Sequence, residues 1–282
     1  MKKGFFAALP MYIFTLFFVA VPLIYLAALS FMERNGVWGV DASFTLDNYR
    51  RISEPAYYGT FIFSLKLSLI TTLVTALIGY PFGYLMSRCE NGRLRACMLF
   101  LVILPFWTNA LVRIYGFIIL LRGNGLLYSL LKLAGYGGEQ LSFLYTQPAV
   151  ILGMVYALLP FMILTVYSSC SKLDPTVLEA ARDLGASGFK GFVTVTLPLT
   201  ADGLLSGIML VFIPSMGLFF ISDLMGGGKI IILGNLIKNQ IMTAHDYPFA
   251  AALSVMMLIM MLVCLGAVRL LLGGGRKRGE TR

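Results

Sequence analysis

Side chains that commonly catalyse reactions or bind metals are sparse in this chain of 282 residues. It contains one histidine, His245, and four cysteines, and no two cysteines form a C-x-x-C pair. Zinc sites and Ser-His-Asp triads need several such groups within reach of one another. The sequence therefore indicates no catalytic residue and no metal site, and we expect the cysteines to be reduced and to pack as small apolar side chains.

A phosphate-binding loop is also missing from the sequence. The segment Met225–Ile230 reads M-G-G-G-K-I, but no serine or threonine follows Lys229 to hold Mg²⁺. We therefore expect no cofactor in this chain. Any ATP-driven step would need ATP and Mg²⁺ on a partner chain.

The composition is that of an integral membrane protein, since 59% of the residues are hydrophobic and 12% are charged. Soluble proteins carry about 25% charged residues. Apolar runs near or above roughly 20 residues cross a bilayer as helices, whereas barrel strands are about ten residues long and alternate in polarity. The sequence thus predicts an all-α integral membrane protein with six transmembrane helices. The predicted spans are residues 5–32, 57–86, 96–121, 148–170, 199–221 and 248–272.

The first apolar run could also be a cleaved signal peptide, because it follows Lys2 and Lys3. The apolar part of a signal peptide has about 7–15 residues. The run at 5–32 is longer, so we expect it to be retained as a span.

Basic residues in the connecting segments predict the orientation, because they are enriched on the cytoplasmic side. Thirteen lysines and arginines lie near the two ends of the chain and in residues 87–95 and 171–198, against seven in the opposite segments. We expect both termini, segment 171–198 and the basic tail 273–282 to be cytoplasmic, in the inner membrane of a bacterium. The net charge of +9 reflects this bias and contact with anionic lipid, not binding to nucleic acid.

Segment 171–198 is a polar stretch between two long apolar runs. Asp174-Pro175 is a strong helix start, because aspartate accepts the first free N–H groups and proline has none to leave unpaired. Gly185 is well placed to end that helix, and Ser187 can cap a second one. The pattern predicts a helix–turn–helix before the fifth span.

The composition of this stretch indicates a docking surface. Glu179 and Asp183 carry charge, while Ala180 and Ala181 permit close approach of another backbone. The alternative is a surface helix with a solvated charged face. A loop that merely joined two spans would need none of this pattern.

The stretch resembles the EAA signature of ATP-binding-cassette (ABC) importer permeases. That signature reads E-A-A-x3-G-x9-I-x-L-P, and here it is Glu179-Ala180-Ala181, Gly185 and Val195-x-Leu197-Pro198, with valine in place of isoleucine. The resemblance implies a coupling loop that docks on a cytoplasmic ABC ATPase dimer. It would make Glu179 the polar anchor, Ala180 and Ala181 the close-packing surface, and Gly185 the turn.

Further motifs are similar to those of the spermidine/putrescine permeases, in particular the first of the two homologous permease subunits that pair in that transporter. These motifs are Phe44–Tyr49, Pro105–Asn109, Arg113–Gly116, Leu159–Phe161, Ala180–Ser187 and Met216–Gly227. The resemblance implies a second permease subunit, a periplasmic or extracellular substrate-binding protein and a polyamine cargo. Some of these motifs are shared with permeases for other solutes, such as metal chelates or organic phosphonates.

A polyamine path needs carboxylates and aromatic faces. Asp223 could bind an ammonium group, Trp107 and Tyr115 could stack on the cargo, and Asn109 could accept hydrogen bonds from it. Trp107 can equally be a packing or interfacial aromatic. Asp223 can equally be the partner of Arg113, since charges within spans are usually paired. Arg113 on the path would argue against a polycation.

Other classes of protein fit the sequence less well. A self-contained secondary transporter usually carries a ladder of charged residues through its spans, and a membrane enzyme needs a catalytic cluster. The sequence indicates neither of them.

The predicted spans contain two G-x-x-x-G pairs, at Gly79 and Gly83 and at Gly203 and Gly207. These pairs predict close helix packing.

Overall fold

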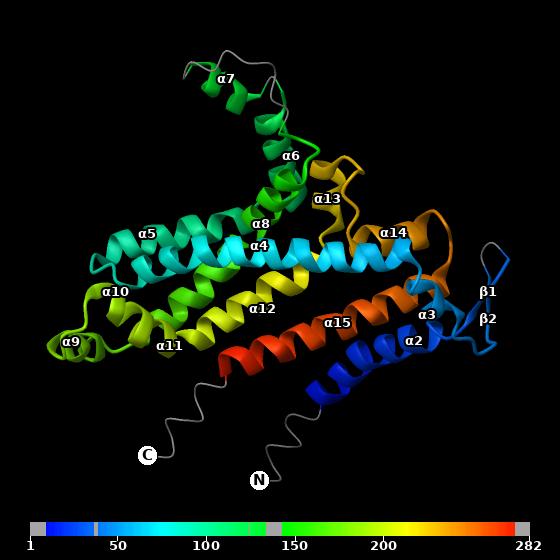
Figure 1. The fold of residues 1–282 in the computed structure, drawn as a ribbon, viewed down its shortest axis with the longest axis horizontal. Coiled ribbons are helices and arrows are strands. Elements are labelled where there is room, and N and C mark those ends of the chain that lie inside the picture. Colours follow the sequence, from blue (N-terminus) through cyan, green and yellow to red (C-terminus); the bar gives the residue numbers. More distant parts are fainter. Residues whose placement is uncertain (1–9, 37–38, 124, 134–142, 274–282) are drawn as a thin grey trace, which may run out of the picture. The chain divides into compact units, whose positions relative to one another are not determined.

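The computed structural model describes residues 10–36, 39–123, 125–133 and 143–273, in which helices dominate (Figure 1). This confirms the predicted helical membrane fold. Within the described residues the strands form one small hairpin, β1 (Glu33–Asn35) and β2 (Gly39–Asp41), in antiparallel register. Lys2, Lys3, residues 5–9 of the first predicted span and residues 274–282 of the basic tail lie outside the described residues.

The helices, in chain order, are η1 (Leu16–Ala20), α2 (Val21–Leu29), α3 (Asp47–Ile52), α4 (Pro55–Ser87), α5 (Gly92–Ile103), η2 (Leu104–Trp107), α6 (Ala110–Leu121), α7 (Leu126–Leu133), α8 (Gln147–Cys170), α9 (Pro175–Asp183), α10 (Gly188–Gly191), η3 (Phe192–Thr196), α11 (Leu197–Leu199), α12 (Ala201–Gly217), α13 (Phe219–Gly226), α14 (Leu233–Met242) and α15 (Tyr247–Gly273).

Four described helices are long and apolar enough to cross a membrane, and two bent pairs raise the number to six if each pair is one span. These six follow the predicted segments in order. The straight ones are Pro10–Leu29, Pro55–Ser87, Gln147–Cys170 and Tyr247–Val268, and the bent pairs are Gly92–Trp107 with Ala110–Leu121 and Gly188–Leu199 with Ala201–Gly217.

The third predicted span, residues 96–121, is not one continuous helix. Its two parts are bent by 98° between Trp107 and Ala110. Asn109 is extended at this point, and its side-chain oxygen accepts a hydrogen bond from the Leu111 N–H at 2.8 Å. Asparagine in this role starts a new helix, so the local sequence breaks the span although its hydropathy continues.

The fifth predicted span, residues 199–221, is also divided. α12 begins after a bend of 68° at Thr200, whose backbone is not helical. It ends at Gly217, and residues 219–221 belong to α13. Pro214 lies in the last turn of α12, where proline removes a backbone hydrogen bond.

The described chain forms two compact units, residues 10–62 with 233–262 and residues 63–232 with 263–273. In the larger unit α8 is the central helix. α5, α6, α12 and α13 all contact it, and its side chains Val150, Met154, Met162 and Val166 are fully buried. A helix that is apolar on all sides is expected in such a position.

Glycines of α4 and α12 bring the backbones of these helices close to α8. A Cβ atom at Gly83 would lie 2.8 Å from the Ile163 carbonyl oxygen, and one at Gly203 would lie 2.3 Å from the Ser169 Cβ. Similar clashes would arise at the partner positions Gly79 and Gly207. Both predicted G-x-x-x-G contacts are therefore confirmed, and both are made with α8.

The smaller unit is held by polar contacts around α3. The Asn48 side chain donates to the carbonyl oxygens of Ser30 (3.1 Å) and Met32 (2.9 Å) just after α2. Arg51 forms an ion pair with Asp246 at 2.9 Å and lies 3.9 Å from the centre of the Phe249 ring. These contacts join α3 to the end of α2 and to the start of α15.

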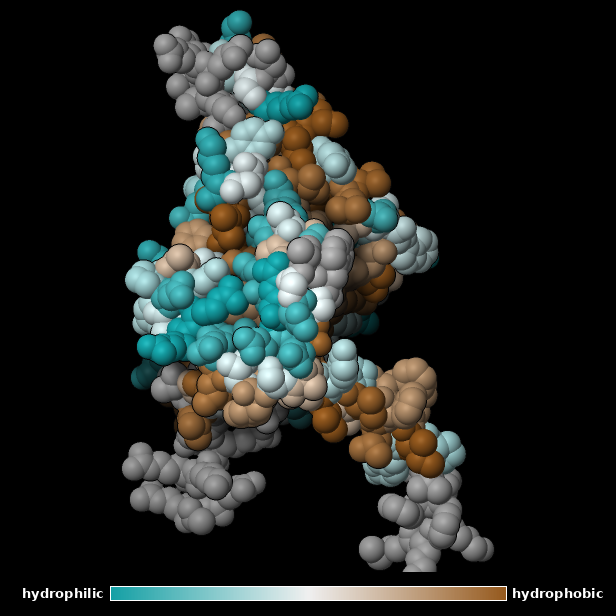
Figure 2. All heavy atoms as spheres, turned by 90° about the vertical axis from the view of Figure 1, so that its right-hand side faces the viewer, coloured by the Kyte–Doolittle hydropathy of each residue, from teal (hydrophilic) through white to brown (hydrophobic). Residues whose placement is uncertain are grey.

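Figure 2 is seen from the side on which Figure 1 shows β1, β2 and α3 of the smaller unit, and hydrophilic residues gather there. Exposed charged side chains in these elements are Glu33, Arg34, Asp41, Asp47 and Arg50. Such a surface is suited to water.

We expect Gly83→Val to lower the free energy of unfolding by about 1–3 kcal/mol, the usual cost of overpacking. The new side chain meets a backbone oxygen of α8, which cannot turn away. Gly266→Val is the matched control, because nothing lies within 4 Å of a Cβ at Gly266 in α15. Thermal unfolding of the purified protein in detergent measures both, and equal melting temperatures would contradict the close contact.

We expect Asp246→Asn to destabilise the smaller unit. Asp246 is 3% exposed, whereas its partner Arg51 is 38% exposed. Because solvent screens the exposed guanidinium, we expect the free energy of unfolding to fall by only about 1–2 kcal/mol. Asparagine still offers an oxygen to the Phe249 N–H, which Asp246 accepts at 3.2 Å. Hydrogen exchange at the start of α15 should increase in this variant and stay unchanged in Asp41→Asn, an exposed control on β2.

Candidate functional site

Segment 171–198 forms the predicted helix–turn–helix. Asp174 accepts a hydrogen bond from the Thr176 N–H at 3.0 Å and starts α9. This backbone N–H lowers the pKa of the Asp174 carboxyl. Ser187 accepts from the Lys190 N–H at 3.3 Å and starts α10. Figure 1 shows α9 and α10 at one end of the larger unit, beyond the end of α8 and the start of α12.

Gly185 forms the turn between these helices. Its φ of +83° lies in the left-handed region, where side chains are strained. Its N–H donates to the Arg182 carbonyl at 2.8 Å, and the next N–H donates to the Ala181 carbonyl at 3.0 Å. The predicted position of the turn is thus confirmed, whereas its role in coupling stays a prediction.

The tip of this helix–turn–helix presents both charge and apolar surface. Glu179, Ala180 and Asp183 are exposed, and Ala181 is half-buried. The tip also exposes two large apolar side chains, Leu184 at 90% and Phe189 at 79%. These two side chains add apolar surface to the candidate site. Their signal in the sequence is their position on either side of Gly185, where the chain turns.

The second half of the segment is attached to the core. Leu197 packs against a buried cluster that includes Tyr80, Met162 and Val211, and Pro198 is exposed at the start of α11. The predicted second helix continues past α10 as the wider helix η3. The segment thus has a fixed base and an exposed tip.

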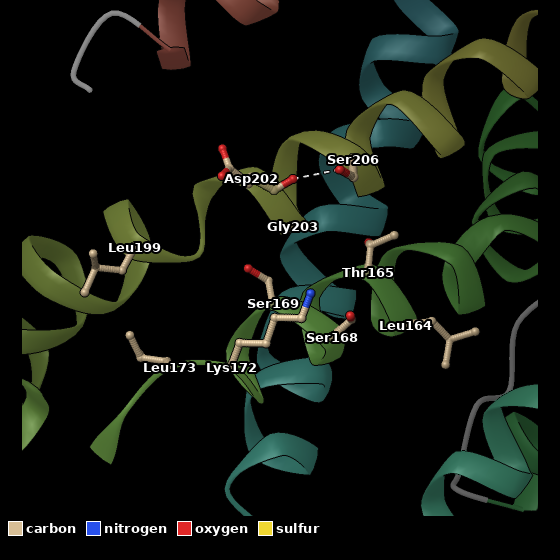
Figure 3. Close-up of a pocket in the computed structure, with 10 residues that line it drawn as sticks. All are labelled: Leu164, Thr165, Ser168, Ser169, Lys172, Leu173, Leu199, Asp202, Gly203 and Ser206. Atoms are coloured by element: carbon tan, nitrogen blue, oxygen red, sulfur yellow. Dashed lines mark hydrogen bonds between the residues drawn. The ribbon is translucent and has the colours of Figure 1, made fainter. Parts of the chain in front are cut away.

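A pocket of about 590 Å³ opens at this base between α8 and the start of α12 (Figure 3). Lys172 and Asp202 lie on different walls, and the Ser206 hydroxyl donates to the Asp202 carbonyl at 2.8 Å. The lining residues are Leu164, Thr165, Ser168, Ser169, Lys172, Leu173, Leu199, Asp202, Gly203 and Ser206. The sequence analysis did not identify this pocket, although polar residues four apart at Ser168 and Lys172 and at Asp202 and Ser206 were a signal for it.

The predicted path residues come from three elements. Trp107 in η2 and Tyr115 in α6 are 75% and 52% exposed, and Trp107 packs edge-on against Phe100. Asn109 caps α6, which uses one acceptor site of its side-chain oxygen. Asp223 is half-buried in α13, a helix that contacts both α6 and α8.

An ion pair between Arg113 and Asp223 is the alternative to a role of Asp223 in the path, and this pairing stays a prediction. Nε and Nη1 of Arg113 are buried and have no hydrogen-bond partner in the described part of the chain. The guanidinium lies over the Tyr156 ring, 5.7 Å from its centre. An aromatic face attracts a cation, so α8 supplies one contact for the Arg113 guanidinium.

The chain is similar in sequence to known transport-system membrane proteins. Residues 79–273 match the family described as "Binding-protein-dependent transport system inner membrane component". The "Spermidine/putrescine transport system permease protein PotB" of Escherichia coli (strain K12) is 44% identical over 90% of this chain and 94% of the relative. The protein of that name from Haemophilus influenzae is 43% identical over 87% of this chain and 86% of the relative.

A solved structure supports the fold. A chain of the bacterial alginate ABC transporter, in complex with an alginate pentasaccharide-bound periplasmic protein, superposes with a TM-score of 0.75. The superposition covers 95% of this chain and 93% of that chain at 15% identity. The fold of that chain is therefore shared. The family match extends over most of the sequence, and with the 44% identity to a permease it shows that this chain belongs to the family of binding-protein-dependent transport system inner membrane components.

Proposed function

We propose that this chain is the permease subunit of an ATP-driven importer for polyamines such as spermidine and putrescine. The observation that carries the proposal is the 44% identity over 258 residues with a spermidine/putrescine permease. Similarity at this level extends through the predicted path as well as the coupling loop. The subunit would form the path and leave catalysis to a partner.

ATP hydrolysis would take place on a separate cytoplasmic ABC ATPase dimer that binds segment 171–198. The exposed tip supports this proposal, because Leu184 and Phe189 offer apolar surface beside the charges of Glu179 and Asp183. Apolar side chains surrounded by polar ones are typical of protein-binding surfaces. ATP and Mg²⁺ would be bound by the partner.

Two further partners belong to the proposal. The family description names a binding protein, which would deliver cargo from the periplasm or the extracellular side. A second homologous permease would complete the path, because the described residues of this chain leave Trp107 and Tyr115 exposed. The excess of basic residues supports an inner-membrane orientation with both termini cytoplasmic.

The path residues suit a flexible cation. Trp107 and Tyr115 expose aromatic faces, and Asp223 supplies a carboxylate. The Arg113 guanidinium carries a positive charge in the same helix as Tyr115 and lies over the Tyr156 ring, so it would repel a cation on the path. The polyamine cargo is therefore supported by the sequence similarity and not by Arg113.

We expect Asp223→Asn to reduce polyamine uptake at least about tenfold, since a charge-assisted hydrogen bond contributes about 1.5–3 kcal/mol. Uptake of radiolabelled spermidine and putrescine is measured in cells that lack their own polyamine importers and express the complete transporter. Asp41→Asn, on the exposed hairpin, is the control. Normal uptake by Asp223→Asn would remove Asp223 from the path, and no uptake by the unmodified, assembled complex would contradict the cargo.

We expect Glu179→Lys and Gly185→Val to leave the subunit in the membrane but to disconnect it from the ATPase. The first reverses a charge at the tip, and the second forces a side chain into a backbone with φ of +83°. Gly266→Val in α15 is the control, because Gly266 lies outside the segment, has ordinary φ and has open space around it. Co-purification of the ATPase and cargo-stimulated ATP hydrolysis measure the effect, and wild-type values in both variants would contradict the coupling loop.

A further inference from the structure

A buried hydrogen bond joins the base of the coupling loop to α4. The hydroxyl groups of Tyr80 and Thr200 lie 2.7 Å apart. Thr200 donates its own proton to the Thr196 carbonyl at 2.7 Å, so the Tyr80 hydroxyl is the donor to Thr200. The side chains of Tyr80 and Thr200 are 6% and 1% exposed, and water therefore cannot replace a broken bond.

Thr200 lies where the chain bends. The helical segment Gly188–Leu199 and α12 meet there at 68°, and the Thr200 backbone is not helical. The bond from Tyr80 is made to this residue. It therefore holds the bend itself and not a position further along either helix.

Aromatic rings make a second connection between the loop and α4. Phe192 in η3 packs edge-on against Tyr80, with ring centres 5.6 Å apart, and against Tyr84, at 5.9 Å. Edge-to-face pairs are favourable and depend on orientation. Phe192 therefore sits between two rings that are one helical turn apart on α4.

α4 is distant from the loop along the chain. The loop continues directly into α8 and α12, so a movement of its tip reaches these two helices through the backbone. α4 ends at Ser87 and receives such a movement through side-chain contacts. Tyr80 makes one of these contacts, and the adjacent Gly79 lies against Met162 of α8.

We propose that Tyr80 is a positioning residue for transport: with Phe192 it holds the bend at Thr200 to α4, so that α4 follows the coupling loop when the ATPase moves it. The inference rests on the proposed coupling function and adds a third helix to those that the loop moves. Sliding the loop past α4 would take the buried Tyr80 hydroxyl away from its acceptor on Thr200 and separate Phe192 from the rings of Tyr80 and Tyr84.

The test uses the complete transporter, with its partner permease, ATPase and binding protein, in proteoliposomes. Spermidine uptake and ATP hydrolysis are measured in the same vesicles. We expect Tyr80→Phe and Thr200→Val each to lower the uptake per ATP hydrolysed about fivefold, in line with one buried hydrogen bond. The double variant should lose no more than either single one, because both remove the same bond.

Two controls separate this role from a general effect on packing. Tyr84→Phe makes the same change one turn further along α4 and should leave the ratio unchanged. Thr200→Ser keeps the hydroxyl group and should retain the ratio of the unmodified transporter. Tyr80→Phe with an unchanged ratio, or with uptake and hydrolysis reduced in equal proportion, would overturn the proposal.

A distance measurement provides a readout that does not depend on the cargo. Spin labels are placed at Leu77 on α4 and Thr194 in η3, both exposed. We expect their separation to stay constant between the nucleotide-free and vanadate-trapped transporter, and to change on trapping in Tyr80→Phe. A change already present in the unmodified transporter would overturn the proposal. Failure of Glu179→Lys to affect ATPase binding would instead contradict the coupling function.

Discussion

The approach of two glycine pairs to the backbone of α8 is the contact on which the larger unit depends. A Cβ at Gly83 would lie 2.8 Å from a carbonyl oxygen of α8, and one at Gly207 would lie 2.6 Å from the Thr165 hydroxyl. Lipid tails are as apolar as leucine side chains, so helices in a membrane associate through close packing and hydrogen bonds. Here the glycines provide that packing on two sides of one helix.

This arrangement explains how a polar loop can be exposed yet fixed. The loop leaves α8 at Cys170 and enters α12 at Ala201, two helices that are already in close contact where Gly203 meets Ser169. The two ends of the loop are therefore held next to each other. The pocket at the same base is lined by polar side chains such as Lys172 and Asp202 together with the leucines Leu164, Leu173 and Leu199. A rigid base with an exposed tip is what a docking surface requires.

The features that the sequence predicted correctly depend on neighbouring residues. Asp174, Ser187 and Gly185 act within one helical turn, and residues four apart, such as Gly203 and Gly207, share one helix face. The features that the sequence did not predict depend on residues that are far apart along the chain. Tyr80 and Thr200 are 120 positions apart, and the exposure of Leu184 follows from how the loop leaves the core. Hydropathy continued through Asn109 and so concealed the break before α6.

The same contacts determine where the subunit can move. α4, α8 and α12 are joined by glycine packing, and the bond from Tyr80 lies beside Gly79, so rotating α4 against α8 would disrupt both contacts at once. These helices and the loop base are therefore expected to move as one body. Hinges are formed by a few residues at the ends of elements. Asn109, extended before α6, and Leu218, not helical between α12 and α13, are such residues, and both adjoin helices that carry predicted path residues.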